Sequence, residues 1–270
     1  MIPFYLITNV GTLTSSTYAQ HFPRHFLLAQ IYTNAPPVYQ KIVRDLRRRG
    51  LKLILDCGAY EGVLIDIPEY VDIIKDIKPD IVVLPDIPFD GSATKERAKE
   101  FLMMTQWQAP HYIYVPHGDC VSDTLAAYDI AFHTIDPLRF IIGLGISYKH
   151  WCSSPPNHGC DSGDEYDHPE KGRIEFVQDV LNITGAEHFR LHLFGGRRRP
   201  TKQFTRWTDQ IVGLDAYDPC ACALSGRAYP IEGTFKKLDH GSLKEPATDD
   251  LLKTSVENFC ELYGINAGRE

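Results

Sequence analysis

The sequence predicts a (β/α)8 barrel of the TIM type, formed by one domain over residues 1–270. Three observations support this fold class. The chain has 270 residues and 43% hydrophobic content, which suffices for one large core. Short apolar runs recur along it, and most are continuous, as in parallel strands that are covered on both faces. Stretches with helical periodicity lie between these runs, so strands and helices are expected to alternate.

Seven apolar runs are expected to be the strands. They lie at residues 4–7, 51–55, 80–84, 111–115, 139–144, 189–194 and 210–214. Three successive runs start about thirty residues apart, which is the length of one strand-helix unit. Seven strands are more than most doubly wound sheets need. The eighth strand of the barrel has no clear candidate, so we expect it to be degenerate.

Three segments between the runs have the periodicity of amphipathic helices. They are residues 38–50, which end at Gly50, residues 68–78 and residues 94–107. A long polar stretch at 148–173 is expected to be a loop inserted into the barrel, because a connection of this length is uncommon unless it is functional or disordered. Residues 240–270 are expected to form a C-terminal helical extension.

Composition limits the classes of function. No run of eighteen apolar residues occurs, and the first ten residues lack the basic-then-apolar pattern of a signal peptide, so a cytoplasmic protein without membrane contact is expected. The seven cysteines have no framework spacing, which favours reduced thiols. The net charge of −7 argues against a general basic coat, but local basic stripes can still bind phosphate.

Acidic and glycine residues follow most of the predicted strands. In such barrels the chemistry lies at the C-terminal ends of the strands, so these residues are expected to surround one pocket. They are Asn9, Asp56, Asp86, His117, Gly118, residues 143–147, residues 195–199, Asp215 and Asp218. The alternative for each is a helix cap or a turn. Arg47, Arg48 and Arg49 precede a strand and are expected on the opposite, stabilising face.

Four stretches resemble the tRNA-guanine transglycosylase superfamily, in the family's order along the chain. They are LDCGAYEG (55–62), LPDIPF (84–89), VPHG (115–118) and GLDAYDPCACALSGR (213–227). GLGIS and LHLFGG lie where that family has the glycine-rich strand ends of its base pocket. The resemblance covers about residues 50–230, and it is nearest to the branch of the superfamily that acts on DNA.

The resemblance implies a role for each matching residue. Asp218 corresponds to the nucleophile that attacks the sugar, and Asp56 to the second catalytic carboxylate. Asp215 lies in the same stretch, but Asp218 aligns with the nucleophile. The base pocket would comprise Asp86, His117, Gly118, Gly143, Gly145 and Tyr60. Cleaving an N-glycosidic bond needs one carboxylate for the developing sugar cation and an acid for the departing base.

The chain also departs from that family. The family's structural zinc module is missing, because only Cys260 follows residue 230. His117 replaces the family's glutamine at the base edge, which puts specificity for a deazaguanine in doubt. Cys152, His158, Cys160 and His168 are residue types that can ligate zinc, but their spacing matches no standard site. Neither a metal nor another cofactor is therefore expected.

A basic segment after one predicted strand is expected to grip nucleic acid. The residues assigned to this contact are Arg197, Arg198, Arg199, Lys202, Arg206, Trp207 and Arg227. Arginine and lysine bind phosphate, and aromatic rings interleaved with them stack on bases. The alternative is a solvated basic loop.

These expectations favour a DNA glycosylase that flips out a modified base and excises it, leaving an abasic site. DNA is favoured over tRNA because the small acidic chain has no separate RNA-binding domain. The first alternative is a transglycosylase that exchanges guanine for a 7-deazaguanine in DNA. The second is an inactive barrel that binds nucleic acid. The base and the oligomeric state are not predicted.

Overall fold

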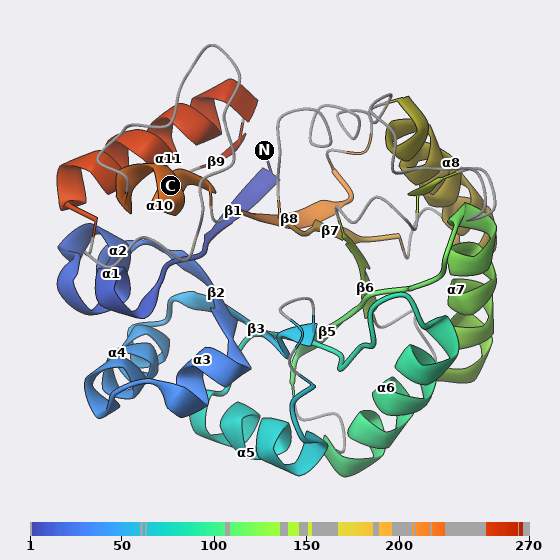
Figure 1. Cartoon of the computed structure of the whole chain (residues 1–270), viewed down its shortest axis with the longest axis horizontal. Helices are drawn as coiled ribbons and strands as arrows, with labels where there is room; N and C mark the ends of the chain where they lie inside the picture. The colour runs from blue at the N-terminus through green and yellow to red at the C-terminus, as the bar shows by residue number, and fades with distance from the viewer. Residues whose placement is uncertain are drawn as a thin grey trace.

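A computed structural model shows a closed barrel of eight parallel strands surrounded by helices (Figure 1). The strands are β1 (Ile2–Leu6), β2 (Arg24–Leu28), β3 (Lys52–Asp56), β4 (Ile81–Val83), β5 (His111–Tyr114), β6 (Phe140–Leu144), β7 (Leu191–Leu193) and β8 (Ile211–Ala216). Each strand pairs with the next, and β1 pairs with both β8 and β2, which closes the barrel. The predicted TIM-type fold is confirmed.

The structure describes most of the chain but not all of it. The described residues are 2–59, 62, 64–105, 109–135, 140–145, 151–152, 167–185, 189–195, 207, 209–216, 218–224, 247–263 and 265–266.

The strand that the sequence did not reveal is β2, with the sequence RHFLL. It begins with two polar residues and runs directly into α3 (Ala29–Asn34) without a glycine or proline between them. The run FLLAQIY therefore has no boundary signal and does not read as a separate strand. In the structure β2 pairs with β3 through five residues but with β1 only through Leu6 and His25. The contact between β1 and β2 is thus a short seam.

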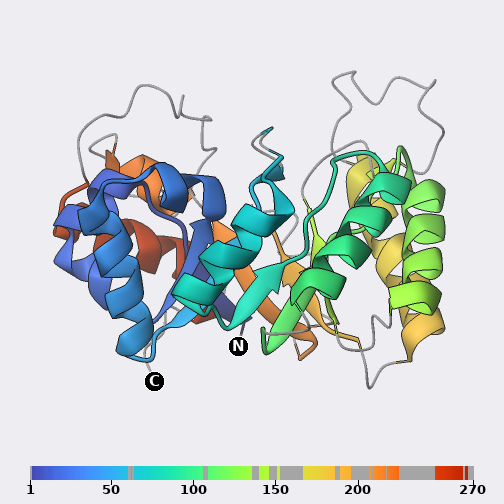
Figure 2. The same cartoon turned by 90° about the horizontal axis from the view of Figure 1, so that it is seen from below.

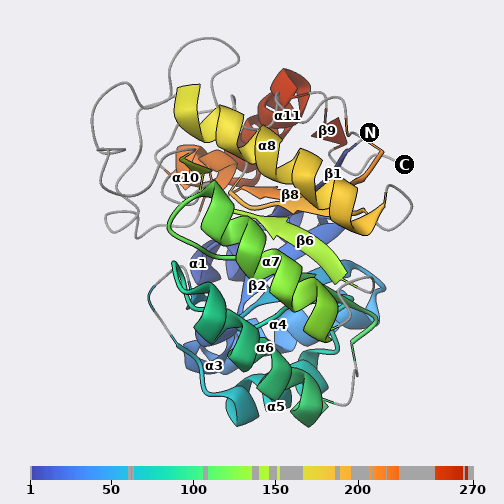
Figure 3. The ribbon, with the colours of Figure 1, turned by 90° about the vertical axis from the view of Figure 1, so that its right-hand side faces the viewer.

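Helices follow the strands around the outside of the barrel. Besides α3 they are α1 (Val10–Ser15), α2 (Thr17–His21), α4 (Pro37–Arg48), α5 (Ile67–Ile77), α6 (Gly91–Thr105), α7 (Val121–Ile135), α8 (Asp167–Thr184), α10 (Asp218–Leu224) and α11 (Asp249–Tyr263). Helices α4, α5 and α6 confirm the three predicted helices. Figure 3 shows α6, α7 and α8 side by side over one flank of the barrel.

The two predicted additions to the barrel are described only in part. Helix α8 begins at Asp167, inside the predicted insertion 148–173, most of which lies outside the described residues. In the predicted C-terminal extension, α11 is followed by the short strand β9 (Ile265–Asn266), which pairs in parallel with the start of β1.

Alternate side chains of the strands form two apolar layers. One layer fills the barrel interior and consists of Tyr5, Phe26, Ile54, Ile81, Val83, Ile113 and Ile141. Their neighbours along the strands, such as Leu6, Leu55 and Leu144, point outward and pack in the larger cluster under the helices. Filling both layers with large side chains makes the barrel a packed core rather than a pore.

The arginine run at 47–49 lies where it was expected, at the end of the barrel where the strands begin. Arg47 pairs with Asp80 at 3.3 Å, and Arg48 pairs with Asp45 on its own helix. Arg49 donates to the carbonyl oxygen of Gln20 at 2.9 Å. The contacts of Arg47 and Arg49 join the end of α4 to Asp80, before β4, and to Gln20 in α2, as expected for a stabilising face.

Five described cysteines are free thiols, namely Cys57, Cys120, Cys220, Cys222 and Cys260. Cys152, however, is bonded in a disulfide. The expectation of reduced thiols is therefore wrong at this position, because spacing along the sequence does not reveal which sulfurs the fold brings together. Among the helices that the structure describes, none combines the length and apolarity needed to cross a bilayer.

Candidate functional site at the barrel mouth

Two acidic residues lie close together where strands β3 and β4 end. Asp56 is the last residue of β3 and is half-buried. Ile54, two positions earlier, belongs to the interior layer, so Asp56 lies on the same, inward face of the strand. Asp86 follows β4 by three residues and is 8% exposed. The structure thus brings two of the predicted site residues to the mouth of the barrel.

His117, which follows β5, contacts Asp86 directly. Its Nε2 lies 2.6 Å from Oδ2 of Asp86, and both side chains are almost fully buried. The N–H of Phe89 points at Nδ1 of His117 from 3.5 Å, which favours the tautomer that carries its proton on Nε2. In that tautomer the imidazole donates to the carboxylate, so the strand ends of β4 and β5 are joined by one short hydrogen bond.

Cys57 forms a hydrogen bond with the other carboxylate oxygen of Asp86. Its Sγ donates to Oδ1 at 3.2 Å. Burial raises the pKa of the Cys57 thiol well above its usual value, and the negative charges of Asp86 and Asp56 raise it further. Cys57 is therefore a protonated hydrogen-bond donor and not a nucleophile. A carboxylate has about four lone-pair sites, so Asp86 can still accept hydrogen bonds from a ligand on the sites that Cys57 and His117 leave.

The turn that carries Asp86 is fixed by several hydrogen bonds. The hydroxyl of Thr94 accepts from the N–H of Ile87 at 2.9 Å and donates to its carbonyl at 3.0 Å. Asp90 accepts from the N–H of Ala93 and caps α6. Phe89 has a φ of 69°, which is rare for a bulky residue and is found at functional turns. Several independent contacts therefore fix the conformation of this turn, and they hold the Asp86 carboxylate in one position.

Two of the three predicted glycines at the mouth, Gly118 and Gly143, have no room for a side chain. A Cβ at Gly118 would lie 2.4 Å from the backbone nitrogen of Thr124, and one at Gly143 would lie 2.5 Å from the ring of Phe194. The carbonyl oxygen of Gly145 accepts from the indole N–H of Trp151 at 2.9 Å. Gly118 follows β5, Gly143 lies near the end of β6, and Gly145 follows β6, as predicted. Close packing explains why the first two positions are glycine.

The two acidic residues of the β8 segment lie in different elements, Asp215 within β8 and Asp218 at the start of α10. Asp215 is 2% exposed, and its oxygens accept from His192 and from the N–H of Gly195. A carboxylate held in this way is not available to attack a sugar. Asp218 is the first residue of α10, directly beyond β8, and its side chain lies outside the described part of the structure. The choice of Asp218 as the nucleophile stays a prediction.

Two predicted contacts are corrected by the structure. Trp207 is 8% exposed and packs in the core beneath the helices, so it cannot serve as a stacking surface for a base. A tryptophan next to basic residues reads as an interface residue, but its apolar area is used in the core instead. Cys152 is bonded in a disulfide and is therefore not available as a zinc ligand.

Several other predicted residues lie outside the described residues. They are Tyr60, Arg197, Arg198, Arg199, Lys202, Arg206, Arg227, His158 and Cys160. Among the residues that the structure does describe, no three His, Cys, Asp or Glu side chains gather as a metal site would require.

Three residues near or below the mouth were missed by sequence reasoning. Cys57 sits beside Asp56, but a lone cysteine after a strand carries no signal of its own. Gln30 follows the unrecognised strand β2 and lies over Gly58, where a Cβ would be 2.1 Å from its Oε1. Placing β2 would have revealed Gln30, because it repeats the pattern of a polar residue after a strand. His192 alternates with apolar residues inside LHLF, a pattern that indicates a strand and gives no sign of a partner for the histidine.

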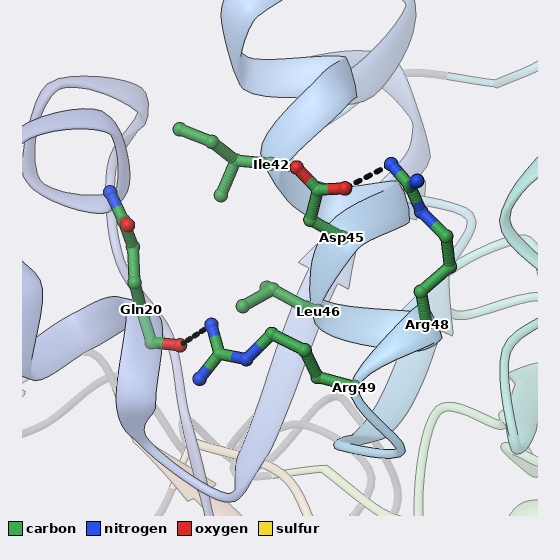
Figure 4. Close-up of a pocket in the computed structure, with 6 residues that line it drawn as sticks. All are labelled: Gln20, Ile42, Asp45, Leu46, Arg48 and Arg49. Carbon is green, nitrogen blue, oxygen red and sulfur yellow. Dashed lines mark hydrogen bonds and ion pairs between the residues drawn. The ribbon is translucent and has the colours of Figure 1, made fainter.

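A surface pocket of about 330 Å³ lies away from the mouth. Figure 4 shows its lining, which comes from α2 and α4 and consists of Gln20, Ile42, Asp45, Leu46, Arg48 and Arg49. Both of its arginines already have partners in Asp45 and the Gln20 carbonyl. Chemistry in a parallel barrel takes place at the C-terminal ends of the strands, so we place the candidate site there and not in this pocket.

No protein-family model matches the chain, and no curated protein matches it in a sequence comparison. The resemblance to tRNA-guanine transglycosylases therefore depends on the short motifs alone. The fold and the mouth residues define a TIM-type barrel with a cluster of acidic residues, a histidine and a thiol at its C-terminal end.

Proposed function

We propose that this protein cleaves the N-glycosidic bond of a modified base in DNA and releases the base. The observation that carries the proposal is the cluster at the mouth, where Asp86 is held by Cys57 and His117 close to Asp56. A TIM barrel supports many reactions, so the proposal depends on these side chains and on the motifs that contain them.

In the proposed reaction Asp218 attacks the anomeric carbon of the sugar. The bond between this carbon and the base nitrogen breaks, and its electron pair moves to the base. Asp56, in its protonated form, gives the base a proton and becomes a carboxylate. It then accepts a proton from water, which attacks the sugar carbon and frees Asp218, leaving an abasic site. The two carboxyl groups need unlike environments so that one is protonated and the other ionised.

Asp86 would hold the extruded base. Its remaining lone pairs accept N–H groups from the edge of the base, while Cys57 and His117 fix the plane of the carboxylate. A base with neighbouring N–H donors suits such an acceptor. Flipping a base into the mouth costs a few kcal/mol, which these contacts would offset.

The variant Asp218→Asn tests the proposal most directly. We expect it to lose cleavage by at least about a thousandfold, because an amide is a poor nucleophile, while folding and DNA binding stay near those of the wild type. Asp72→Asn is the matched control, since Asp72 lies on α5 with an exposed side chain. Equal cleavage by the wild type and Asp218→Asn would exclude Asp218 as the nucleophile.

Mass spectrometry of the products identifies the reaction. Differently modified DNAs and tRNAs are incubated with the protein, and both the polymer and the small molecules are analysed. A free base together with abasic sites indicates hydrolysis, as we propose. A swapped base would indicate exchange, and unchanged DNA and tRNA would contradict both activities.

A further inference from the structure

A second histidine and aspartate form a buried pair inside the barrel, below the mouth. His192 on β7 is fully buried, and its Nε2 lies 2.8 Å from Oδ1 of Asp215 on β8. The strands are neighbours, with His192 in register with Gly213. Neither residue has a role in the proposed reaction.

The surroundings of this pair are aromatic. The ring of His192 lies 4.8 Å from that of Phe194, 5.9 Å from that of Tyr5 and 6.2 Å from that of Phe26, on which it stacks. Burying a carboxylate among such rings is unfavourable unless hydrogen bonds compensate for the lost water. An apolar pair would fill the same space without that penalty, so packing alone does not explain why an acid is present.

The hydrogen bonds of Asp215 suggest what the acid does. Its Oδ2 accepts from the N–H of Gly195 at 3.1 Å, and Gly195 is the second residue after β7. Gly195 has a φ of 60°, so the chain turns there. Asp215 itself precedes Asp218 by three residues. The Asp215 carboxylate, which belongs to the end of β8, is therefore hydrogen-bonded to β7 and to the turn that follows it. We call the segments that directly follow β7 and β8 their exits.

We propose that His192 and Asp215 are positioning residues that set the exits of β7 and β8 relative to each other. Through these exits they fix the start of α10, the helix that begins at Asp218 directly beyond β8. This inference rests on the proposed function, because it assigns the pair to the same site. Small displacements of a reacting group reduce the rate strongly, so even a slight loosening of this link is expected to matter.

Two variants of His192 separate positioning from packing. His192→Phe keeps a ring among Tyr5, Phe26 and Phe194 but removes the donor to Asp215. His192→Gln replaces the ring by an amide that can still donate at a similar position. We expect His192→Phe to lower the single-turnover cleavage rate about tenfold to a hundredfold, while His192→Gln stays within about threefold of the wild type.

His25→Phe is the matched control. His25 is also a buried histidine of a barrel strand, but it faces the helices and is outside the proposed site. All rates are measured at neutral pH and at a temperature where circular dichroism shows each variant to be fully folded. Equal rates for folded His192→Phe and the wild type would overturn the positioning role, as would equal losses in His192→Phe and His192→Gln.

Hydrogen exchange distinguishes a failure of this inference from a failure of the proposed function. If the wild type cleaves no substrate, the proposed function fails, and the link between the strand exits is judged by exchange in His192→Phe. Faster exchange confined to the backbone amides at the ends of β7 and β8 supports the link. Exchange equal to that of the wild type contradicts it.

Discussion

Asp86 accepts hydrogen bonds from a thiol and an imidazole at once, and this arrangement gives a single residue two separable effects. The first is structural, because Cys57 and His117 each lose a partner if the carboxylate is removed. The second belongs to the proposed function, in which the lone pairs that Cys57 and His117 leave on the carboxylate would accept hydrogen bonds from a base. A substitution that keeps the shape but changes the charge separates these effects.

The variant Asp86→Asn makes that change. We expect the free energy of unfolding to fall by about 1 to 3 kcal/mol, because a buried hydrogen-bond pattern is disturbed. We also expect the preference among bases to change, since the amide nitrogen donates where the carboxylate accepted. Urea denaturation and cleavage of a panel of modified DNAs measure the two effects. A loss of stability with an unchanged preference would show that Asp86 only fixes the turn.

At the scale of helices, two glycines differ in the space around them, since one is closely packed and the other is not. Gly172 lies in α8 against the segment that contains Trp151, and a Cβ there would come within 1.8 Å of the Trp151 carbonyl oxygen. Gly11 lies in α1, where the nearest atom to a Cβ would be 3.7 Å away, an ordinary contact. The first glycine is needed for packing, whereas the second only increases the freedom of the unfolded chain.

Alanine at these two positions is expected to have opposite effects. Gly172→Ala should lower the free energy of unfolding by about 1 to 3 kcal/mol, because α8 must shift away from the carbonyl. Gly11→Ala should raise it by about 0.4 to 1 kcal/mol. Urea denaturation of both variants against the wild type measures the difference. Stabilisation by Gly172→Ala would show that α8 does not lie against Trp151 in solution.

For the molecule as a whole, the seam between β1 and β2 contains a group sensitive to acid. His25, which pairs with Leu6 at this seam, is fully buried, and burial lowers its pKa to about 4. The unfolded chain has the ordinary pKa of 6.5, so between these values it binds more protons than the folded barrel. The free energy of unfolding therefore falls as the pH drops from 6.5 towards 4, by about 3 kcal/mol from this residue.

The variant His25→Phe should remove this part of the acid sensitivity. Urea denaturation at pH 7.5 and pH 4.5 gives the loss of stability on acidification for the wild type and the variant. We expect a smaller loss in the variant, because phenylalanine does not titrate and fits beside Phe22, whose ring lies 6.4 Å from that of His25. Equal losses would place the acid sensitivity elsewhere.

The fold followed from the sequence because continuous apolar runs and amphipathic helices are local patterns. β2 did not, since its strand and the next helix share one uninterrupted apolar run. For the site, the ends of strands predicted Asp56, Asp86 and His117 as neighbours. The contacts of Cys57, and the pairing of His192 with Asp215, depend on distances across the barrel that no local pattern contains.

The pairing of Ile2 with Ile265 has a practical consequence for attaching the protein to a support. Strands begin at the end of the barrel opposite the mouth, and the N mark in Figure 2 lies at that lower edge. A tether placed at either of these two residues would therefore fix the protein by its base. Immobilised molecules would all present the mouth to the solution, where even a large ligand could reach it without steric hindrance from the surface.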